Sequence, residues 1–394
     1  MEKYFGLLPN CKYAYGKNGG CIYDTSTGKM IAIDEESDFI LRQAFRNNKV
    51  DDEIPILNDL VVNNFGEFYE KPLMHECLID GRQTEKYQIT NSTNKIERLF
   101  VQITNECNKD CAFCNKTVKV YTKTHCKKWN NVEKNISQEV WKENLKKMKY
   151  LGLREVRFIG GNPFLNISKL QNIIKCAKEV GIDNFYVYSN LEVLNDDMLN
   201  LCRENNIKII LEVLEWKDAL KENIIKCIDL DVVVESSILL SKKTEDKIEK
   251  ICNELKELQI KKITLEYLYC STENSWYSSK YSFYKRKKTF GRVSEQSLLM
   301  HELCNNCLYG QIYINISGDV TPCPMMNDIK LGNIVRDDLY EILCKTEYQE
   351  IIHLTRSKLP KCKDCAYRYN CLDCRALEMS KSGNLYETDF CEFL

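Results

Sequence analysis

The sequence lacks the features of membrane, secreted and nucleic-acid-binding proteins. It contains no run of 18 apolar residues, so no transmembrane helix is predicted. The first residues, MEKYFGLLPN, include neither a basic leader nor a long apolar stretch, which argues against a secretory signal. Lys and Arg number 56 and Asp and Glu 57, so no charge excess favours nucleic acid or membrane surfaces. We therefore expect a cytoplasmic protein without nucleic-acid or membrane partners.

Cysteine, in contrast, is abundant. The chain has 394 residues, of which 44% are hydrophobic and 29% charged, as in soluble proteins of two or three domains. Its 21 cysteines are an odd number in a large chain without a signal, which argues against a disulfide scaffold. In a reducing compartment, clustered thiolates are better interpreted as metal ligands. Ten cysteines are isolated and are expected to pack as small apolar residues, whereas eleven fall into tight groups.

Residues 1–95 contain no cysteine cluster and form the first predicted domain. Two short strands, 21–24 and 30–34, flank a Ser-Thr-Gly turn. An amphipathic helix over about 40–45 and another over 54–65 follow. This order predicts a small domain of short strands followed by helices.

Residues 96–290 alternate between strand and helix patterns and form the second predicted domain. The predicted strands are 99–103, 155–159, 185–188, 207–213, 232–236 and 262–267. Six β/α repeats imply a parallel sheet, either curved into an open barrel or wound flat. The active site of such a sheet lies at the carboxyl ends of its strands.

Residues 291–394 form the third predicted domain, which holds eight cysteines and few periodic segments. Ligand bonds are therefore expected to replace part of its hydrophobic core. Polar stretches at 83–94 and 271–292 are predicted to connect the three domains.

The first cysteine group lies immediately after the first strand of the second domain. Cys107, Cys111 and Cys114 provide three thiolates within eight residues, which can bind three corners of a four-iron cluster. One iron then keeps an open position for a substrate or cofactor. A zinc site that lacks its fourth ligand, or incidental thiols, are the alternatives.

This spacing resembles the motif of the radical S-adenosylmethionine (SAM) superfamily, in which an aromatic residue such as Phe113 often precedes the last cysteine. The resemblance implies that the amino and carboxylate groups of SAM chelate the fourth iron. An electron from a donor such as flavodoxin or ferredoxin would then cleave SAM to the 5′-deoxyadenosyl radical. The protein binds and positions this cofactor, which supplies the reactive group.

The segment after the second strand reads Gly160-Gly161-Asn162-Pro163. Its glycines allow the backbone to approach a ligand closely. In the family, a Gly-Gly-Glu-Pro-like segment meets the methionine amino group of SAM. Asn162 replaces the acid, so we expect weaker SAM binding rather than loss of chemistry. An ordinary Gly-Asn-Pro turn is the alternative.

The third strand ends at Ser189-Asn190, which loosely matches a Thr-Asn-Gly-like turn near the cofactor of the family. A simple capping turn explains this pair equally well. Glu212 and Glu235 are predicted to be surface carboxylates rather than polar ligands in the barrel.

The eight C-terminal cysteines divide into two sets of four, which suits two fully ligated Fe–S clusters or two zinc sites. Their order resembles the SPASM domain of radical SAM enzymes that modify peptides, although two residues, not three, separate the last grouped pair. The resemblance implies an inner auxiliary cluster bound by Cys304, Cys307, Cys323 and Cys374. It implies an outer auxiliary cluster bound by Cys362, Cys365, Cys371 and Cys391.

The N-terminal strands and helices resemble the PqqD-like peptide-recognition element of peptide maturases. In that family the leader of a precursor peptide adds as a strand to a sheet edge beside a helix. The expected edge is 30–34, beside the helix 54–65. A small cap that only packs on the barrel is the alternative.

Together these patterns predict an α/β fold. It has an N-terminal winged-helix-like domain, a partial (β/α)6 TIM-type barrel and a C-terminal Fe–S SPASM domain. SAM and three [4Fe–4S] clusters are the expected cofactors. The expected reaction is an intramolecular crosslink in a ribosomally made peptide, with a thioether favoured and a carbon–carbon bond next. A peptide epimerase, a sulfatase-maturase-like oxidase and a silent peptide carrier are the alternatives.

Overall fold

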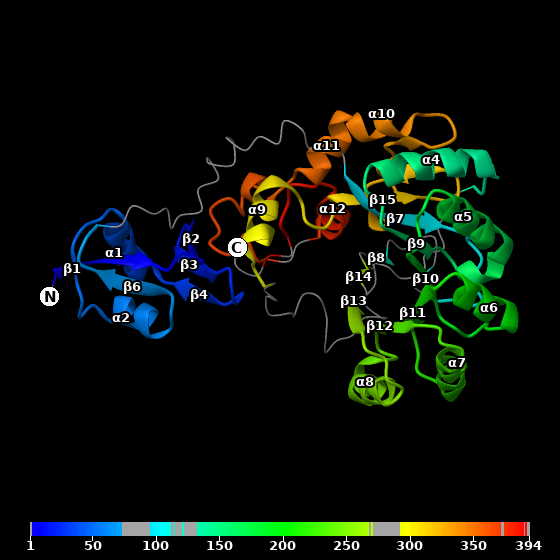
Figure 1. Cartoon of the computed structure of the whole chain (residues 1–394), viewed down its shortest axis with the longest axis horizontal. Helices are drawn as coiled ribbons and strands as arrows, with labels where there is room; N and C mark the ends of the chain where they lie inside the picture. Colours follow the sequence, from blue (N-terminus) through cyan, green and yellow to red (C-terminus); the bar gives the residue numbers. More distant parts are fainter. Residues whose placement is uncertain are drawn as a thin grey trace.

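The fold is that of a computed structural model, which describes residues 2–72, 95–111, 114, 120–121, 132–267, 269–270, 292–371, 374–389 and 391. Phe113, the predicted linker 83–94 and all but Arg292 of the predicted connector 271–292 lie outside the described residues. In Figure 1 the chain begins in a small blue domain, whose strands β2–β4 lie near the chain end, and the large sheet lies beyond it.

The N-terminal segment folds into two small antiparallel sheets. The first contains β1 (Glu2–Leu7), β5 (Val50–Asp51) and β6 (Gly66–Tyr69), and the second contains β2 (Cys11–Gly16), β3 (Gly19–Asp24) and β4 (Met30–Ile33). The pairing of β3 with β4 confirms the predicted hairpin, because Tyr23 opposes Met30 across it. The sequence analysis missed β1 and β2.

Two helices cover these sheets. Asp34 caps α1 (Glu35–Phe45) by accepting a hydrogen bond from the Ser37 amide, and Pro55 occupies the first turn of α2 (Pro55–Val62). Leu41 of α1 and Leu57 of α2 are fully buried in one apolar cluster with residues of both sheets. α1 packs on β3, whereas α2 packs mainly on β6 rather than on the expected β4.

A nine-stranded sheet forms the centre of the molecule, in the order β13-β12-β11-β10-β9-β7-β15-β16-β17. Its first six strands in this order, all parallel, are the six predicted ones, with β12 shifted toward the C-terminus. Their bounds are β7 Ile96–Gln102, β9 Glu155–Ile159, β10 Phe185–Ser189, β11 Ile207–Val213, β12 Val234–Leu240 and β13 Ile263–Tyr267. The helices between them are α4 Gln138–Tyr150, α5 Ile167–Glu179, α6 Asp196–Glu204, α7 Asp218–Asp229 and α8 Ile248–Glu257.

The C-terminal segment extends this sheet. β15 (Gly310–Ile314) pairs in parallel with β7, and β16 (Asp319–Thr321) and β17 (Gly332–Asn333) follow antiparallel. Among the described strands, β13 and β17 lie at the two ends of the sheet, which is therefore a partial barrel and not a closed one. The remaining elements are β8 Val120–Tyr121, β14 Tyr269–Cys270, α9 Glu295–Leu303, α10 Leu339–Cys344, α11 Thr346–Ile352 and α12 Arg375–Ser382.

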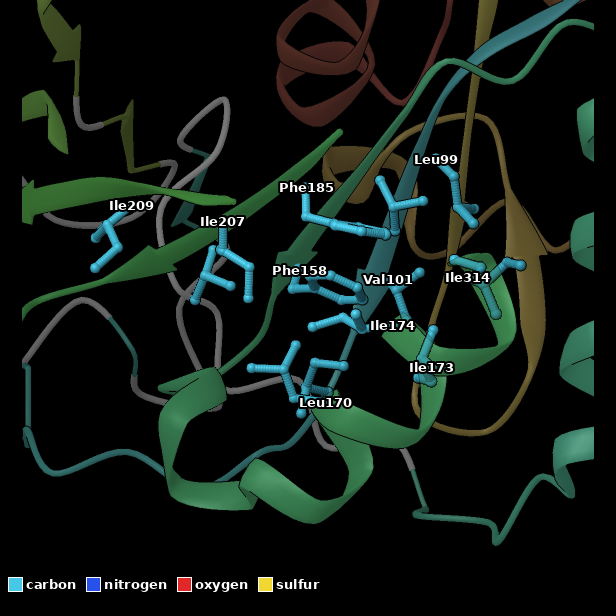
Figure 2. Close-up of a cluster of buried hydrophobic side chains, with 14 of the residues drawn as sticks. Leu99, Val101, Phe158, Leu170, Ile173, Ile174, Phe185, Ile207, Ile209 and Ile314 are labelled. Atoms are coloured by element: carbon cyan, nitrogen blue, oxygen red, sulfur yellow. The ribbon is translucent and has the colours of Figure 1, made fainter. Parts of the chain in front are cut away.

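The main core lies between one face of the sheet and helices α4 to α8. Leu99 and Val101 of β7, Phe158 of β9 and Phe185 of β10 meet there, as Figure 2 shows, together with Ile314 of β15. The rings of Phe158 and Phe185 stack with centroids 6.1 Å apart. Because Ile314 belongs to this core, the cysteine-rich segment is packed onto the barrel sheet. Among the described helices, none has the length and apolar character needed to cross a membrane.

This shared core predicts that Ile314→Ala will lower the free energy of unfolding by about 3 kcal/mol, because it removes a fully buried side chain and leaves a cavity. Ile225→Ala, on the exposed side of α7, is the matched control and should cost less than about 1 kcal/mol. Urea unfolding followed by circular dichroism measures both. Equal losses would show that β15 is not part of the core.

Candidate functional site

Three sequence segments meet at the carboxyl ends of three adjacent strands. The cysteine loop follows β7, Gly160–Pro163 follows β9, and Asn190 follows β10. β9 lies between β7 and β10 in the sheet, so the three segments are neighbours. This is the edge at which parallel α/β sheets place their active sites.

The thiols of the cysteine loop lie close together. The Cys114 amide donates a hydrogen bond of 2.9 Å to the Cys111 carbonyl, which folds the loop into a tight turn. A thiol–thiol hydrogen bond with Cys114 is the main reason that the pKa of Cys111 lies well above its usual range; burial and the Cys107 thiol raise it further. Three thiolates at this spacing repel one another, so a cationic centre is needed for all three to ionise.

Within the described residues, no group of three or more His, Cys, Asp or Glu side chains is arranged to hold a single metal ion. Thiolates around one zinc ion would have to converge on one point at about 2.3 Å. A cubane cluster needs a wider arrangement, because each cysteine binds a different iron. Cys107, Cys111 and Cys114 provide the three thiolates that a cubane cluster with one open iron requires.

Asn108, the residue after the first cysteine, connects the three segments. Its side-chain oxygen accepts hydrogen bonds of 3.1 Å from the side-chain amides of both Asn162 and Asn190. Next to it, Lys109 forms an ion pair with Glu192. The sequence analysis missed Asn108, although its position directly beside a ligand cysteine is the signal that could have identified it.

Asn162 and Ser189 are almost completely buried, each 1% exposed. The Ser189 hydroxyl donates to the Asn162 side-chain oxygen at 3.1 Å, and the same oxygen caps the short 3₁₀ turn Pro163–Asn166. Asn162 is therefore both a turn residue and part of the hydrogen-bonded network. Asn190 likewise forms a local turn by accepting from the Glu192 amide while it donates to Asn108.

Gly160 and Gly161 allow the end of β9 to approach the cysteine loop closely enough for these hydrogen bonds to form. Gly160 has a φ of 138°, which residues with a side chain rarely adopt. A Cβ on Gly161 would overlap the carbonyl oxygen of Glu106 in the cysteine loop. The Asn162 amide also donates to that carbonyl at 2.7 Å. Only glycine at 161 allows this close contact between the loop and the end of β9.

The inner face of the sheet lies beneath the site and is aromatic. It consists of Phe100, Ile159, Tyr186, Tyr188, Ile210 and Tyr313. The Arg157 guanidinium lies 4.7 Å from the Tyr186 ring centroid and donates to the Tyr188 hydroxyl at 2.8 Å. Burial is the main reason that the pKa of Tyr188 is raised to about 12, so the hydroxyl stays protonated at neutral pH. The two-residue alternation along β9 and β10 was the sequence signal for this face.

The prediction for Glu212 was wrong. Its side chain is 2% exposed at the carboxyl end of β11, and it is near enough to Tyr188 to raise the pKa of that hydroxyl. Glu212 follows the inward alternation after Ile210, which outweighs the usual surface preference of carboxylates. Glu235, in contrast, forms an ion pair with Lys262 at 2.7 Å.

The cysteines expected to bind the inner auxiliary cluster lie in and around one apolar cluster. Cys323 and Cys374 share it with Leu308, the residue after Cys307. The Asn305 side chain accepts from the amides of Cys307 and Leu308 at 3.1 and 3.2 Å, which shapes the turn that follows Cys304. Cys304 and Cys323 are buried and Cys307 is exposed.

The cysteines expected to bind the outer auxiliary cluster lie on consecutive turns and at the chain end. The Cys365 amide donates to the Cys362 carbonyl at 2.9 Å, and the Cys371 amide donates to Tyr367 at 3.0 Å. Cys391 closes a further turn through Thr388. All four are partly buried.

Two buried polar atoms without a partner lie near these cysteines. Among the described residues, the side-chain oxygens of Asn370 and Thr388 are buried and accept or donate no hydrogen bond. Asn370 directly precedes Cys371, and Thr388 lies three positions before Cys391. Unpaired buried polar groups are costly, so a bound group that provides hydrogen-bond partners here fits both atoms.

Two protein-family models match this chain. A radical SAM superfamily model matches residues 101–276, and a model of SPASM, an iron–sulfur cluster-binding domain, matches residues 304–366. The chain belongs to the radical SAM superfamily of enzymes, and a SPASM domain follows its radical SAM domain. SAM and [4Fe–4S] clusters are accordingly its cofactors.

The fold is similar to that of solved structures. Streptococcus suis SuiB bound to precursor peptide SuiA is 15% identical, with a TM-score of 0.56 and coverage of 100% of both chains. SuiB bound to S-adenosylmethionine gives a TM-score of 0.54 at 15% identity, over 98% of this chain and 100% of that chain. The anSMEcpe enzyme with bound AdoMet and Cp18Cys peptide gives 0.53 at 13% identity, over 75% and 93%. No curated protein sequence matches the chain.

The amide network predicts a role for Asn108 in SAM binding. Asn108→Ala leaves the buried amide donors of Asn162 and Asn190 unpaired, at a cost of about 1–3 kcal/mol, and should weaken SAM binding about tenfold. Asn108→Asp keeps the accepting oxygen and should change SAM binding less. SAM titration of the reduced cluster, followed by electron paramagnetic resonance, measures the affinity. Equal SAM affinity in Asn108→Ala and wild type would contradict this role.

Proposed function

We propose that the protein is a maturase of a ribosomally made peptide and that it forms an intramolecular crosslink. The observation that carries the proposal is the cysteine loop at the end of β7, joined by Asn108 to the ends of β9 and β10. Cys107, Cys111 and Cys114 would hold the first cluster. When SAM is bound there, reductive cleavage supplies a 5′-deoxyadenosyl radical.

The residues of the network would position the methionine end of SAM. The Asn162 oxygen is neutral, where an acid would offer the ammonium a charge, and it already accepts hydrogen bonds from the Ser189 hydroxyl and the Phe164 amide, so its role is to position the segment. Ser189 and Asn108 fix the orientation of this side chain, because one donates to its oxygen and the other accepts from its amide. Gly160 and Gly161 keep the backbone close to the loop, and Pro163 begins the 3₁₀ turn that follows. Phe113, the aromatic residue before the last cysteine, completes the expected contacts.

In the proposed reaction the peptide loses two hydrogens in total, one as a hydrogen atom and one as a proton and an electron. One hydrogen atom passes from a peptide carbon to the deoxyadenosyl radical and gives 5′-deoxyadenosine. The carbon radical bonds to a Cys sulfur, whose proton leaves, and the surplus electron passes to an auxiliary cluster. We favour this thioether, because a thiol is readily deprotonated and nucleophilic. A carbon–carbon bond has the same balance. An external reductant such as flavodoxin or ferredoxin supplies the initial electron.

The arrangement of the N-terminal sheet β2-β3-β4 supports the proposal that the substrate is a peptide. One of its faces packs on α1 through Ile22, and the other packs on the C-terminal segment through Tyr23. At the β2 edge, the Tyr15 carbonyl accepts from Arg368. The edge of β4 pairs with no further strand among the described residues. Such an edge can accept a leader peptide as an added strand.

The identity of the product tests the proposed reaction. Reduced, cluster-loaded enzyme incubated with SAM and the peptide encoded by a neighbouring short reading frame should give 5′-deoxyadenosine and a peptide two hydrogens lighter. Mass spectrometry with fragmentation locates the new bond. Cys111→Ala should abolish both products, whereas Cys344→Ala, at an exposed cysteine outside the three groups, should retain them.

The other outcomes separate the alternatives. A peptide of unchanged mass with an inverted stereocentre would identify an epimerase, and an oxidised but uncrosslinked residue would identify a sulfatase-maturase-like oxidase. Intact SAM after incubation with the reduced, loaded protein would support a silent peptide carrier and would contradict the proposal.

Strand addition at β4 predicts that leader binding depends on backbone amides. Two leader peptides with N-methyl groups on alternate residues, in the two possible registers, should differ in affinity for the full-length protein by about tenfold or more, because only one register removes inter-strand hydrogen bonds. Fluorescence anisotropy of labelled leaders measures both. Equal binding of the two peptides would exclude strand addition.

A further inference from the structure

Among the described residues, the hydrogen bonds between the N-terminal domain and the rest of the chain concentrate on one short segment, residues 362–371, and Val293 and Leu298 add apolar contacts beside it. The Lys17 amide donates to the Asp364 carbonyl at 2.8 Å. The Tyr23 hydroxyl donates to the Ala366 carbonyl at 2.5 Å. In the opposite direction, the Arg368 guanidinium donates to a β2 carbonyl at 2.8 Å. Figure 1 shows β2, β3 and β4 on the side of the blue domain that faces the C-terminal part.

Apolar packing reinforces these hydrogen bonds. Ala14, Cys21 and Tyr23 form a buried cluster with Ala366 and Tyr369. The two tyrosine rings meet edge to face at 6.0 Å. The fit is tight beside the cluster as well, because a Cβ added to Gly16 would lie only 2.8 Å from the Ala366 Cβ.

The same segment carries three of the four cysteines expected to bind the outer auxiliary cluster: Cys362, Cys365 and Cys371. The structure describes every residue from 359 to 370, and this stretch contains no helix or strand. It consists of successive turns. Its sequence, CKDCAYRYNC, is too polar to form an apolar core of its own. A turn segment of this kind depends on ligand bonds for its shape.

The ligand position lies directly at the domain contact. Ala366 and Asp364, which accept the hydrogen bonds from Tyr23 and Lys17, are the two chain neighbours of Cys365. Burial is the main reason that the pKa of the Cys21 thiol is raised to about 12, and the Cys365 thiol is near enough to raise it further. A change of backbone at Cys365 therefore moves the groups that hold the N-terminal domain.

We infer that the iron–sulfur centre at Cys362, Cys365, Cys371 and Cys391 holds the surface on which the N-terminal domain docks. Loss of this centre then releases the face of the sheet β2-β3-β4. The inference rests on the cluster assignment of the proposed function but goes beyond it. It gives the outer cluster a structural role in placing the peptide-recognition domain, in addition to any role in electron transfer.

Hydrogen exchange of the full-length, reconstituted protein tests this inference. In Cys365→Ala, amides over residues 13–24, including Lys17, should exchange at least about tenfold faster than in wild type. Peptides from β7, β9 and α12 should keep their protection, which shows that the variant is folded. Cys344→Ala is the matched control and should match wild type in exchange and iron content.

Iron analysis separates the two ways in which the inference can fail. Cys365→Ala should lose about four iron atoms, the content of one cluster. Loss of this iron with unchanged exchange over residues 13–24 would overturn the docking role while leaving the proposed function intact. Unchanged iron would show that Cys365 is not a ligand, and would overturn both the cluster assignment and the docking role.

The effect of docking on the outer cluster provides a second test, in a variant that keeps all its cysteines. Coupling between two sites is mutual, so weaker docking should make the outer cluster easier to remove. Tyr23→Phe deletes the hydrogen bond to Ala366 and should lower about fivefold, the effect of one hydrogen bond, the chelator concentration that removes half of the cluster iron at equilibrium. Tyr150→Phe, at a side chain 85% exposed, is the control. Equal chelator midpoints in Tyr23→Phe and wild type would contradict the coupling.

Discussion

The parallel pairing of β15 with β7 is the interaction on which the arrangement of the active site depends. β7 leads into the cysteine loop, and β15 belongs to the segment that carries the auxiliary cysteines. Gln102, at the end of β7, accepts hydrogen bonds from the Tyr313 hydroxyl and the Ile316 amide. One sheet thus supports both the cysteine loop of the candidate site and the SPASM domain, so their relative position is fixed by backbone pairing and by the common core around Ile314.

Amide groups perform the connecting role at the site where an acid would be expected. Asn108 joins Asn162 and Asn190 through neutral hydrogen bonds at three neighbouring strand ends. Neutral groups bind an ammonium less strongly than a carboxylate does, but they can be buried without the cost of burying a charge. Charged groups lie around this network: Lys109 pairs with Glu192 beside Asn108, and Arg157 contacts Glu155 and Tyr188 on the inner face of the sheet.

The sequence was sufficient to predict the six strands of the barrel, since alternating β/α segments carry strong periodic signals. Its cysteine spacing also predicted the family. β15 was not predicted, because a five-residue strand in a cysteine-rich segment has no periodicity that distinguishes it from a loop. Asn108 and Glu212 were missed for another reason: their roles come from contacts between strand ends that are distant in sequence. β3 docks on residues 364–370, which lie more than 340 positions further along the sequence. No local sequence pattern could therefore predict this contact.

The central claim is that a radical formed at Cys107, Cys111 and Cys114 takes a hydrogen atom from a peptide. Isotope transfer tests it most directly. With a precursor peptide deuterated at its carbon positions, the account predicts 5′-deoxyadenosine that contains one deuterium from the peptide. Formation of 5′-deoxyadenosine without deuterium, at the same rate with and without peptide, would contradict the account.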